Sequence, residues 1–153
     1  MTKELLIVGG PNGSGKTTFS KSFLDEYNYE FLNADEIASE LSEDGNQAGN
    51  ISAGKEYFKR IEKLKTKNKN IILESTLSGM FLIKLIKEFK KKEYNVKIIF
   101  VVLNAPEQCI ERIKHRVVTG GHFVPDDDVR RRFIRGKNNF WNIYKSMVED
   151  WKL

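Results

Sequence analysis

The sequence has little cysteine, little proline and no long apolar run. Its 153 residues include one cysteine, Cys109, and 3 prolines. A single cysteine excludes an internal disulfide, and so few prolines exclude a collagen-like or proline-rich disordered chain. The longest apolar run, residues 98–103, is far shorter than the about 20 residues of a membrane-spanning helix. Met1 leads into the apolar residues 5–8 without a signal-peptide pattern, so we expect a cytoplasmic protein without membrane contact.

Acidic residues are fewer than basic ones, 21 against 26, which gives a net charge of +5. This balance permits an anionic partner without identifying it. The lysines at residues 63–69 and 90–92 fall on polar faces of expected helices, which is typical of a solvated surface, so we do not expect a nucleic-acid partner. The chain is 40% hydrophobic and long enough for one core, which predicts a single domain over residues 1–153.

Apolar runs alternate with segments of helical periodicity along the whole chain, and this alternation predicts the fold. We expect strands at residues 4–9, 30–33, 70–74 and 96–103. We expect helices at residues 16–26, from Asp35 to before Gly45, and at residues 51–67, 80–92, 106–118 and 126–149. Such a pattern is typical of an α/β protein with a mostly parallel sheet covered by helices on both faces, as in the three-layer P-loop NTPase fold.

One motif, G-x-x-x-x-G-K-[ST], lies between the first strand and the first helix. It predicts an ATP site formed by Gly10, Pro11, Asn12, Gly13, Ser14, Gly15, Lys16, Thr17 and Thr18. The glycines let backbone N–H groups approach the phosphates, and the helix dipole favours their charge. Lys16 is expected to bridge the phosphates as part of the catalytic machinery, and Thr17 to ligate Mg²⁺.

Two carboxylates follow later strands at the edge of the sheet where ligands of parallel sheets bind. Asp35 follows the second strand and is placed to accept a proton from an attacking hydroxyl, although it could instead cap the next helix. Glu74 ends the third strand and should face the same crevice to orient the acceptor. Its alternative is a rim carboxylate that caps the turn at residues 78–79.

Most of the arginines fall between Arg112 and Arg135. Guanidinium groups bind phosphate through two parallel hydrogen bonds, and a double glycine, Gly120 and Gly121, separates two arginine-bearing helices. We therefore expect a lid at residues 117–135 that closes over the transferring phosphate. Surface ion pairs with residues 126–128 are the alternative for any single arginine. The expected order of importance is Arg116 and Arg131 first, then Arg112 and Arg132, with His122 contacting substrate.

Four blocks together resemble the zeta-toxin family of P-loop kinases, in its short bacterial branch. They are residues 9–19, 31–38, 74–79 and 116–133, which keep the order and spacing of the family over nearly the whole chain. The resemblance implies that Asp35 is the base, that Glu74 and Thr76 lie in the substrate-binding block and that lid arginines contact the phosphates. The full set of expected substrate-binding residues is Asn33, Glu74, Ser75, Thr76, His122, Arg112 and Arg132. The resemblance also implies phosphorylation of a sugar hydroxyl of UDP-N-acetylglucosamine. Such proteins usually continue past residues 151–153 into a further strand and a loop that helps to hold adenine, so we expect either a truncated C-terminus or weak binding of adenine.

The sequence thus predicts an ATP- and Mg²⁺-dependent kinase that acts on a nucleotide-linked sugar, with an antitoxin protein as a possible partner. Two alternatives stay open. The first is a nucleoside or polynucleotide kinase, and the second is a catalytically weak ATP-binding module that pairs with a neutralising partner.

Overall fold

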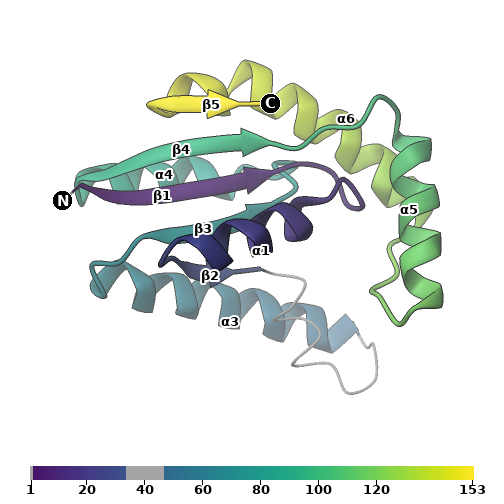
Figure 1. Ribbon diagram of the computed structural model, residues 1–153, viewed down its shortest axis with the longest axis horizontal. Coiled ribbons are helices and arrows are strands. Elements are labelled where there is room, and N and C mark those ends of the chain that lie inside the picture. Colours follow the sequence, from purple (N-terminus) through teal and green to yellow (C-terminus); the bar gives the residue numbers. More distant parts are fainter. Residues whose placement is uncertain (1, 34–46) are drawn as a thin grey trace.

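The computed structural model describes residues 2–33 and 47–153 and shows an α/β fold (Figure 1). Its strands are β1 (Lys3–Gly9), β2 (Glu30–Leu32), β3 (Ile71–Ser75), β4 (Tyr94–Phe100) and β5 (Asp150–Lys152). Its helices are α1 (Lys16–Glu26), α3 (Gln47–Thr66), α4 (Phe81–Lys91), α5 (Pro106–Val118) and α6 (Asp126–Asn142), followed by the 3₁₀ helix η1 (Tyr144–Met147). The helix expected from Asp35 lies outside the described residues.

The strands form one parallel sheet in the order β2-β3-β1-β4-β5. β1 lies at the centre, where Ile7 is opposite Leu73 of β3 and Ile98 of β4. Because the strands are parallel, their carboxyl ends meet at one edge of the sheet. The loop at residues 10–15 leaves β1 at that edge, and Glu74 lies near the end of β3 there.

Alternate residues of β1 face two different cores, as the period of a strand dictates. Leu5 and Ile7 pack in the larger core with residues of α3, α4 and α6, whereas Leu6 and Val8 pack on the side of Phe19 in α1. Figure 1 shows α1 on the near face of the sheet and α4 on the far face. Helices therefore cover both faces, which confirms the predicted three-layer P-loop fold.

Helix α5 stands beyond the edge of the sheet and packs on α6 through a third apolar cluster. Cys109 and Ile113 of α5 contact Val129 and Phe133 of α6 in this cluster, and all four side chains are buried. The pair of helices thus forms a wall beside the loop that follows β1 (Figure 1). Within residues 2–33 and 47–153, no helix combines the length and the apolar character that crossing a membrane requires.

The strand expected at residues 96–103 is shifted in the structure. β4 begins at Tyr94, whose hydroxyl donates to the carbonyl of Lys69 at 3.0 Å, and ends at Phe100. Beyond it, Val101 and Leu103 pack against two separate apolar clusters. Val101 and Leu103 are therefore apolar because they pack against these clusters after the strand has ended. Hydrophobicity alone consequently predicts a strand that is too long at its C-terminal end.

The last helix is shorter than expected. α6 ends at Asn142, and η1 and β5 follow in place of further helix. β5 pairs with β4, with Trp151 opposite Ile98, and three residues are too few to show a strand period in the sequence. At the other end, Pro125 is the N-cap, and the three aspartates at residues 126–128 lie in the first turn and do not cap it.

Candidate functional site

The loop after β1 has the backbone of a phosphate-binding loop. Gly10, Gly13 and Gly15 have φ angles of 149°, 78° and 105°, which side chains with a Cβ rarely adopt. A Cβ on Gly13 would also lie 2.6 Å from the carbonyl oxygen of Cys109, so α5 leaves no room for one. Gly15 is the N-cap of α1, and the first N–H groups of that helix have no partner within it. The loop therefore lies at the N-terminal, positive end of the dipole of α1, which favours an anion there.

Lys16 and Ser14 lie inside this loop and not on its surface. Lys16 is 9% exposed, and its Nζ donates to the carbonyl of Pro11 at 2.9 Å. The Oγ of Ser14 is buried and has no hydrogen-bond partner among the described residues. A buried hydroxyl without a partner is costly, and a phosphate oxygen would satisfy it. These features fit a triphosphate.

A cleft of about 700 Å³ opens from the loop. Its described lining is Asn12, Gly13, Gly15, Lys16, Thr17, Thr18, Lys21, Asn33, Glu74, Arg112, Arg116, Gly120, Gly121 and His122. We call this space the phosphate cleft. Residues from four predicted sequence blocks meet in it, although they are far apart in the chain.

Glu74 forms the polar floor of the phosphate cleft and is 5% exposed, so it is not a carboxylate on the rim. Its Oε2 accepts hydrogen bonds from Thr17 Oγ1 at 2.9 Å and from Asn33 Nδ2 at 2.7 Å. A hydroxyl and a carboxylate side by side next to a phosphate loop are the oxygen ligands that Mg²⁺ prefers. The residues present therefore fit a magnesium ion held by Thr17 with Glu74 beside it.

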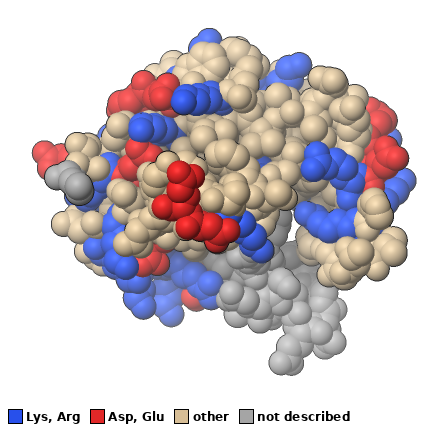
Figure 2. All heavy atoms as spheres, viewed as in Figure 1, with Lys and Arg blue, Asp and Glu red and all other residues tan. Residues whose placement is uncertain are grey.

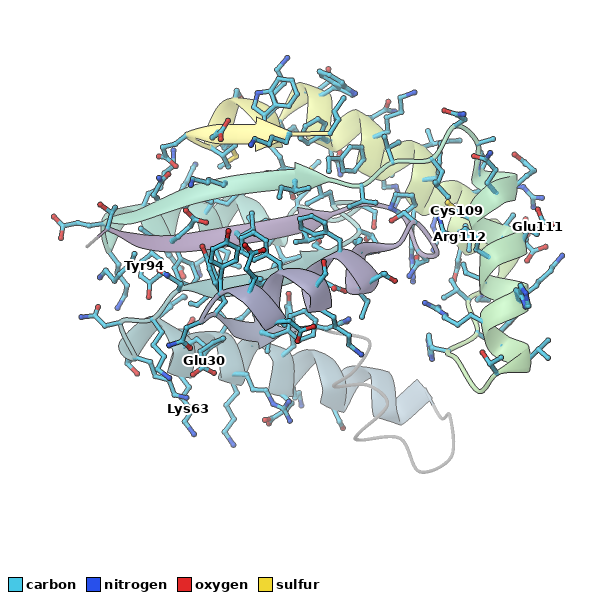
Figure 3. All side chains as sticks on the ribbon, viewed as in Figure 1. Glu30, Lys63, Tyr94, Cys109, Glu111 and Arg112 are labelled. Carbon is cyan, nitrogen blue, oxygen red and sulfur yellow. The ribbon has the colours of Figure 1, made fainter. Side chains whose placement is uncertain are left out.

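Two arginines of α5 line the same cleft from the opposite side. Arg112 Nη1 lies 3.5 Å from the carbonyl oxygen of Ser14, and Arg116 Nη2 donates to the carbonyl of His122 at 3.1 Å. Figure 3 shows Arg112 and Cys109 on the side of α5 that faces the loop, with Glu111 on the outer side. In Figure 2, Lys and Arg side chains border the surface where α5 approaches the rest of the molecule. The positive charge is therefore aimed at the phosphate cleft.

The arginines of α6 divide into two groups. Arg132 Nη1 donates to Asn12 Oδ1 of the phosphate loop at 3.1 Å. Arg131 instead pairs with Asp128 at 2.7 Å, and its side chain is 53% exposed. Arg131 does not line either described pocket, whereas Arg112, Arg116 and Arg132 do. The structure therefore does not support the expected priority of Arg131 over Arg112 and Arg132.

A second pocket of about 300 Å³ adjoins the phosphate cleft. Its described lining is Asn12, Lys16, Asn33, Tyr57, Phe58, Glu74, Ser75, Thr76, Phe81 and Arg132. It shares Asn12, Lys16, Asn33 and Glu74 with the phosphate cleft. We call it the acceptor pocket after the role proposed for it below. The sequence places Phe58 on the apolar core stripe of its helix, but the structure leaves it 51% exposed at this pocket.

The loop after β3, which begins at Thr76, is held in place by α6. The Nδ2 of Asn139 donates to the carbonyl of Leu77 at 2.8 Å, and Leu77 is buried with a φ of 57°. A Cβ on Gly136 would lie 2.4 Å from the carbonyl oxygen of Thr76. Arg132, Gly136 and Asn139 are spaced i, i+4 and i+7, so one face of α6 contacts both the phosphate loop and this loop. Sequence reasoning missed this contact, although a glycine and an asparagine between apolar positions of one helix were a signal for it.

The remaining expected site residues divide between described and undescribed parts. Asp35 lies outside the described residues, so its role as a base stays a prediction. The expected lid corresponds to the end of α5, a loop at residues 119–125 and the first turns of α6, and its closure likewise stays a prediction.

Comparisons with known proteins agree with this fold. The model of a family described as "AAA domain" matches residues 5–135. An uncharacterised protein of Haemophilus influenzae is 30% identical over 133 residues, which cover 87% of this chain and 94% of that protein.

Two solved structures share the fold at low sequence identity. A chain of the Pnkp1/Rnl/Hen1 RNA repair complex aligns with a TM-score of 0.76 at 20% identity over 93% of this chain, which spans 46% of that chain. A chain of the PezAT chromosomal toxin–antitoxin system of Streptococcus pneumoniae aligns with a TM-score of 0.71 at 18% identity over 99% of this chain and 70% of that one. Shikimate kinases and a deoxyadenosine kinase also have this fold. The comparisons thus agree with the site in indicating a kinase-type P-loop domain that binds nucleotide.

Proposed function

The chain belongs to the AAA domain family, and from this premise and the site we propose that it transfers the γ-phosphate of ATP to a hydroxyl of a small acceptor. One observation carries the proposal. The phosphate cleft and the acceptor pocket share Lys16 and Glu74, so a donor and an acceptor bound in them would meet at these two side chains.

The described residues act mainly by positioning and by electrostatic stabilisation. Lys16 and the loop N–H groups bind the phosphates, and Arg112 and Arg116 stabilise charge that develops on the transferring group. Arg132 is placed between the loop and the acceptor pocket to contact the phosphoryl group during transfer. A magnesium ion at Thr17 would neutralise phosphate charge when bound.

Asp35 is proposed as the general base. The acceptor hydroxyl gives its proton to the Asp35 carboxylate as its oxygen bonds to the γ-phosphorus, and the bond from the γ-phosphorus to the bridging oxygen breaks to release ADP. Glu74, buried next to Thr17, orients the acceptor and the metal ligand. The position of Asp35, two residues after Asn33, supports this role because Asn33 itself lies in both pockets.

For the acceptor, the resemblance to zeta toxins favours a sugar hydroxyl of UDP-N-acetylglucosamine. The similarity to a chain of a toxin–antitoxin system is consistent with the zeta-toxin resemblance at the level of the fold, and we propose an antitoxin protein as partner. A nucleoside or a polynucleotide 5′-hydroxyl is the second candidate, because the acceptor pocket has an aromatic lining.

The test is a transfer assay with γ-labelled ATP, magnesium and separate acceptors: UDP-N-acetylglucosamine, uridine and a 5′-hydroxyl RNA oligonucleotide. We expect label on at least one acceptor. Lys16→Ala should lower the rate by roughly a hundredfold or more, and Asp35→Asn by roughly 10²–10⁴-fold with ATP binding retained. Lys63→Ala, which removes an exposed lysine of α3, is the matched control and should leave transfer unchanged.

Two results would contradict the proposal. ATP binding without label on any acceptor would leave a nucleotide-binding module without kinase activity. Full activity of Asp35→Asn would remove Asp35 from the role of base and leave the rest of the proposal standing.

A further inference from the structure

The acceptor pocket contains a cluster of three aromatic rings. Tyr57 and Phe58 come from α3, and Phe81 begins α4. Their ring centroids are 5.8–6.1 Å apart, and each pair is close to perpendicular, with interplanar angles of 72°, 77° and 84°. We call this cluster the aromatic corner.

Two of the three rings of the aromatic corner lie outside the closed core, although Tyr57 belongs to it. Phe58 is 51% exposed and Phe81 is 37% exposed, whereas Tyr57 beneath them is 5% exposed. Two large apolar side chains left open inside a pocket are costly to hydrate, and burying them against a ligand is favourable. The open surface of the corner therefore points to an apolar part of a ligand.

The corner also lies next to the reacting groups. Tyr57 Oη is 3.4 Å from the backbone carbonyl oxygen of Glu74, and the side chain of Glu74 lines both pockets. A molecule against Phe58 and Phe81 is thus adjacent to the residues that would present its hydroxyl to ATP. The rings of the corner line the acceptor pocket and do not line the phosphate cleft.

The chemistry of the corner distinguishes between kinds of acceptor. The rings of Phe58 and Phe81 offer no hydrogen-bonding group, so they can contact only the narrow C–H face of a sugar, whose hydroxyls need polar partners elsewhere. A nucleobase has an apolar face for one ring and a polar edge for the hydroxyls of Ser75 and Thr76, which line the same pocket. Perpendicular rings suit such a flat group, because it can stack on one ring and meet the edge of the other.

We propose that the aromatic corner binds the nucleobase of the acceptor, so that the acceptor is a nucleoside or a nucleotide-linked compound and not a free sugar or polyol. This inference rests on the proposed function and adds to it the residues that recognise the acceptor. It assigns Phe58 and Phe81 to substrate recognition, a role separate from the chemical step.

The experiment compares acceptors with and without a base, and only the first of the two pairs differs in the base alone. Uridine is paired with ribose, and UDP-N-acetylglucosamine with N-acetylglucosamine 1-phosphate. We expect the member of each pair with a base to have a kcat/KM at least about tenfold higher, the size of one base–aromatic stack. Equal use of a base-free acceptor would overturn the inference and leave the kinase function intact.

Variants of the aromatic corner then test whether the nucleobase binds there. Phe58→Ala and Phe81→Ala should each raise the acceptor KM by roughly five- to a hundredfold with little change in the KM for ATP, and Phe58→Tyr should restore it. Tyr27→Ala removes an aromatic ring that is 47% exposed outside both pockets and serves as the control. An unchanged acceptor KM in both alanine variants would overturn the inference.

A binding measurement separates this inference from the proposed function. Phe58→Trp places an indole in the corner, and its fluorescence should be quenched by uridine but not by ribose. Quenching without phosphate transfer to any acceptor would uphold the base site and refute the kinase. No quenching by uridine or UDP-N-acetylglucosamine, in a variant with the wild-type circular dichroism spectrum, would refute the base site.

Discussion

Gly136 is the residue at which α6 approaches the loop after β3 most closely. It is buried, and the carbonyl oxygen of Thr76 occupies the place where a Cβ would lie. Its backbone is ordinary helix, so the lack of a side chain serves close packing and no special φ angle. Gly54 in α3 offers a matched comparison, because a Cβ there would meet no atom within 4 Å.

Gly136→Ala should therefore destabilise the protein by about 1–3 kcal/mol, because the loop must move away from the added methyl group. Gly54→Ala should stabilise it by about 0.5–1 kcal/mol, since alanine favours the helix. Urea denaturation followed by circular dichroism measures both. Equal effects of the two substitutions would show that Gly136 is not closely packed in solution.

Helix α6 contributes Arg132, Gly136 and Asn139 to the candidate site, and the side chain of Asn139 is buried. Asn139 is 7% exposed and satisfies the carbonyl of buried Leu77. The neighbouring Asn138 has the same chemistry but an exposed position. The pair separates the effect of this one hydrogen bond from the effect of asparagine in a helix.

Asn139→Ala should cost about 1–3 kcal/mol of stability, since it leaves a buried carbonyl unpaired. If the loop after β3 positions the acceptor, the variant should also raise the acceptor KM more than the KM for ATP. Asn138→Ala should change neither quantity. The measurements are urea midpoints and steady-state kinetics, and a KM that rises equally for both substrates would argue against a link between this loop and the acceptor.

The elements that the sequence predicts best are those with a long local signal. The glycine motif of the phosphate loop and the apolar stripe of α4 each extend over many consecutive residues, and the structure confirms the loop and the helix. Strand β5 has three residues and depends on pairing with β4, so no local pattern identifies it. The acceptor pocket depends on Phe58 and Phe81 coming together from two helices. The stripe pattern predicts core for Phe58 and does not include Phe81, and the exposure of both side chains is set by tertiary packing.

The roles of the individual arginines also depend on tertiary packing, which the sequence does not reveal. Their number in one region predicts a site for an anion, and four of the seven in the chain lie where the local sequence allows either phosphate contact or an ion pair with an aspartate. Arg131 has Asp128 one turn away and pairs with it, whereas Arg132 is rotated by about 100° and reaches the phosphate loop. The sequence alone does not predict which of two adjacent arginines on a helix faces the phosphate loop.

For the molecule as a whole, several buried groups favour their protonated form in the folded state. Burial raises the pKa of Tyr144 to about 12, and its hydroxyl donates to the carbonyl of Gly79. Burial and then the hydrogen bond to Glu4 raise the pKa of Tyr29. Burial lowers the pKa of Lys65, but hydrogen bonds to Glu62 and Glu88 outweigh it, so the pKa is raised. These groups contribute stability below their unfolded pKa values near 10, and the contribution is lost as the pH rises.

We therefore expect the free energy of unfolding to fall above pH 10. From the pKa of about 12, Tyr144 alone accounts for a loss of about 2 kcal/mol as the pH approaches that value. Tyr144→Phe should be less stable than wild type at pH 8, because Gly79 loses its donor, yet it should lose less between pH 8 and pH 11. Urea midpoints at the two pH values measure this, and an equal loss in both proteins would show that Tyr144 does not titrate in this range.

The single face of α6 that carries Arg132, Gly136 and Asn139 has a consequence for how such a chain can evolve. Seven residues of helix span about 10.5 Å and nearly two turns, so the distance and the angle between the two contacts are fixed together. Inserting one residue between Arg132 and Asn139 would rotate one end of the helix by about 100° relative to the other, and only one contact could survive. The seven-residue spacing therefore sets both the distance and the angle between the contact of α6 with the phosphate loop and its contact with the loop after β3.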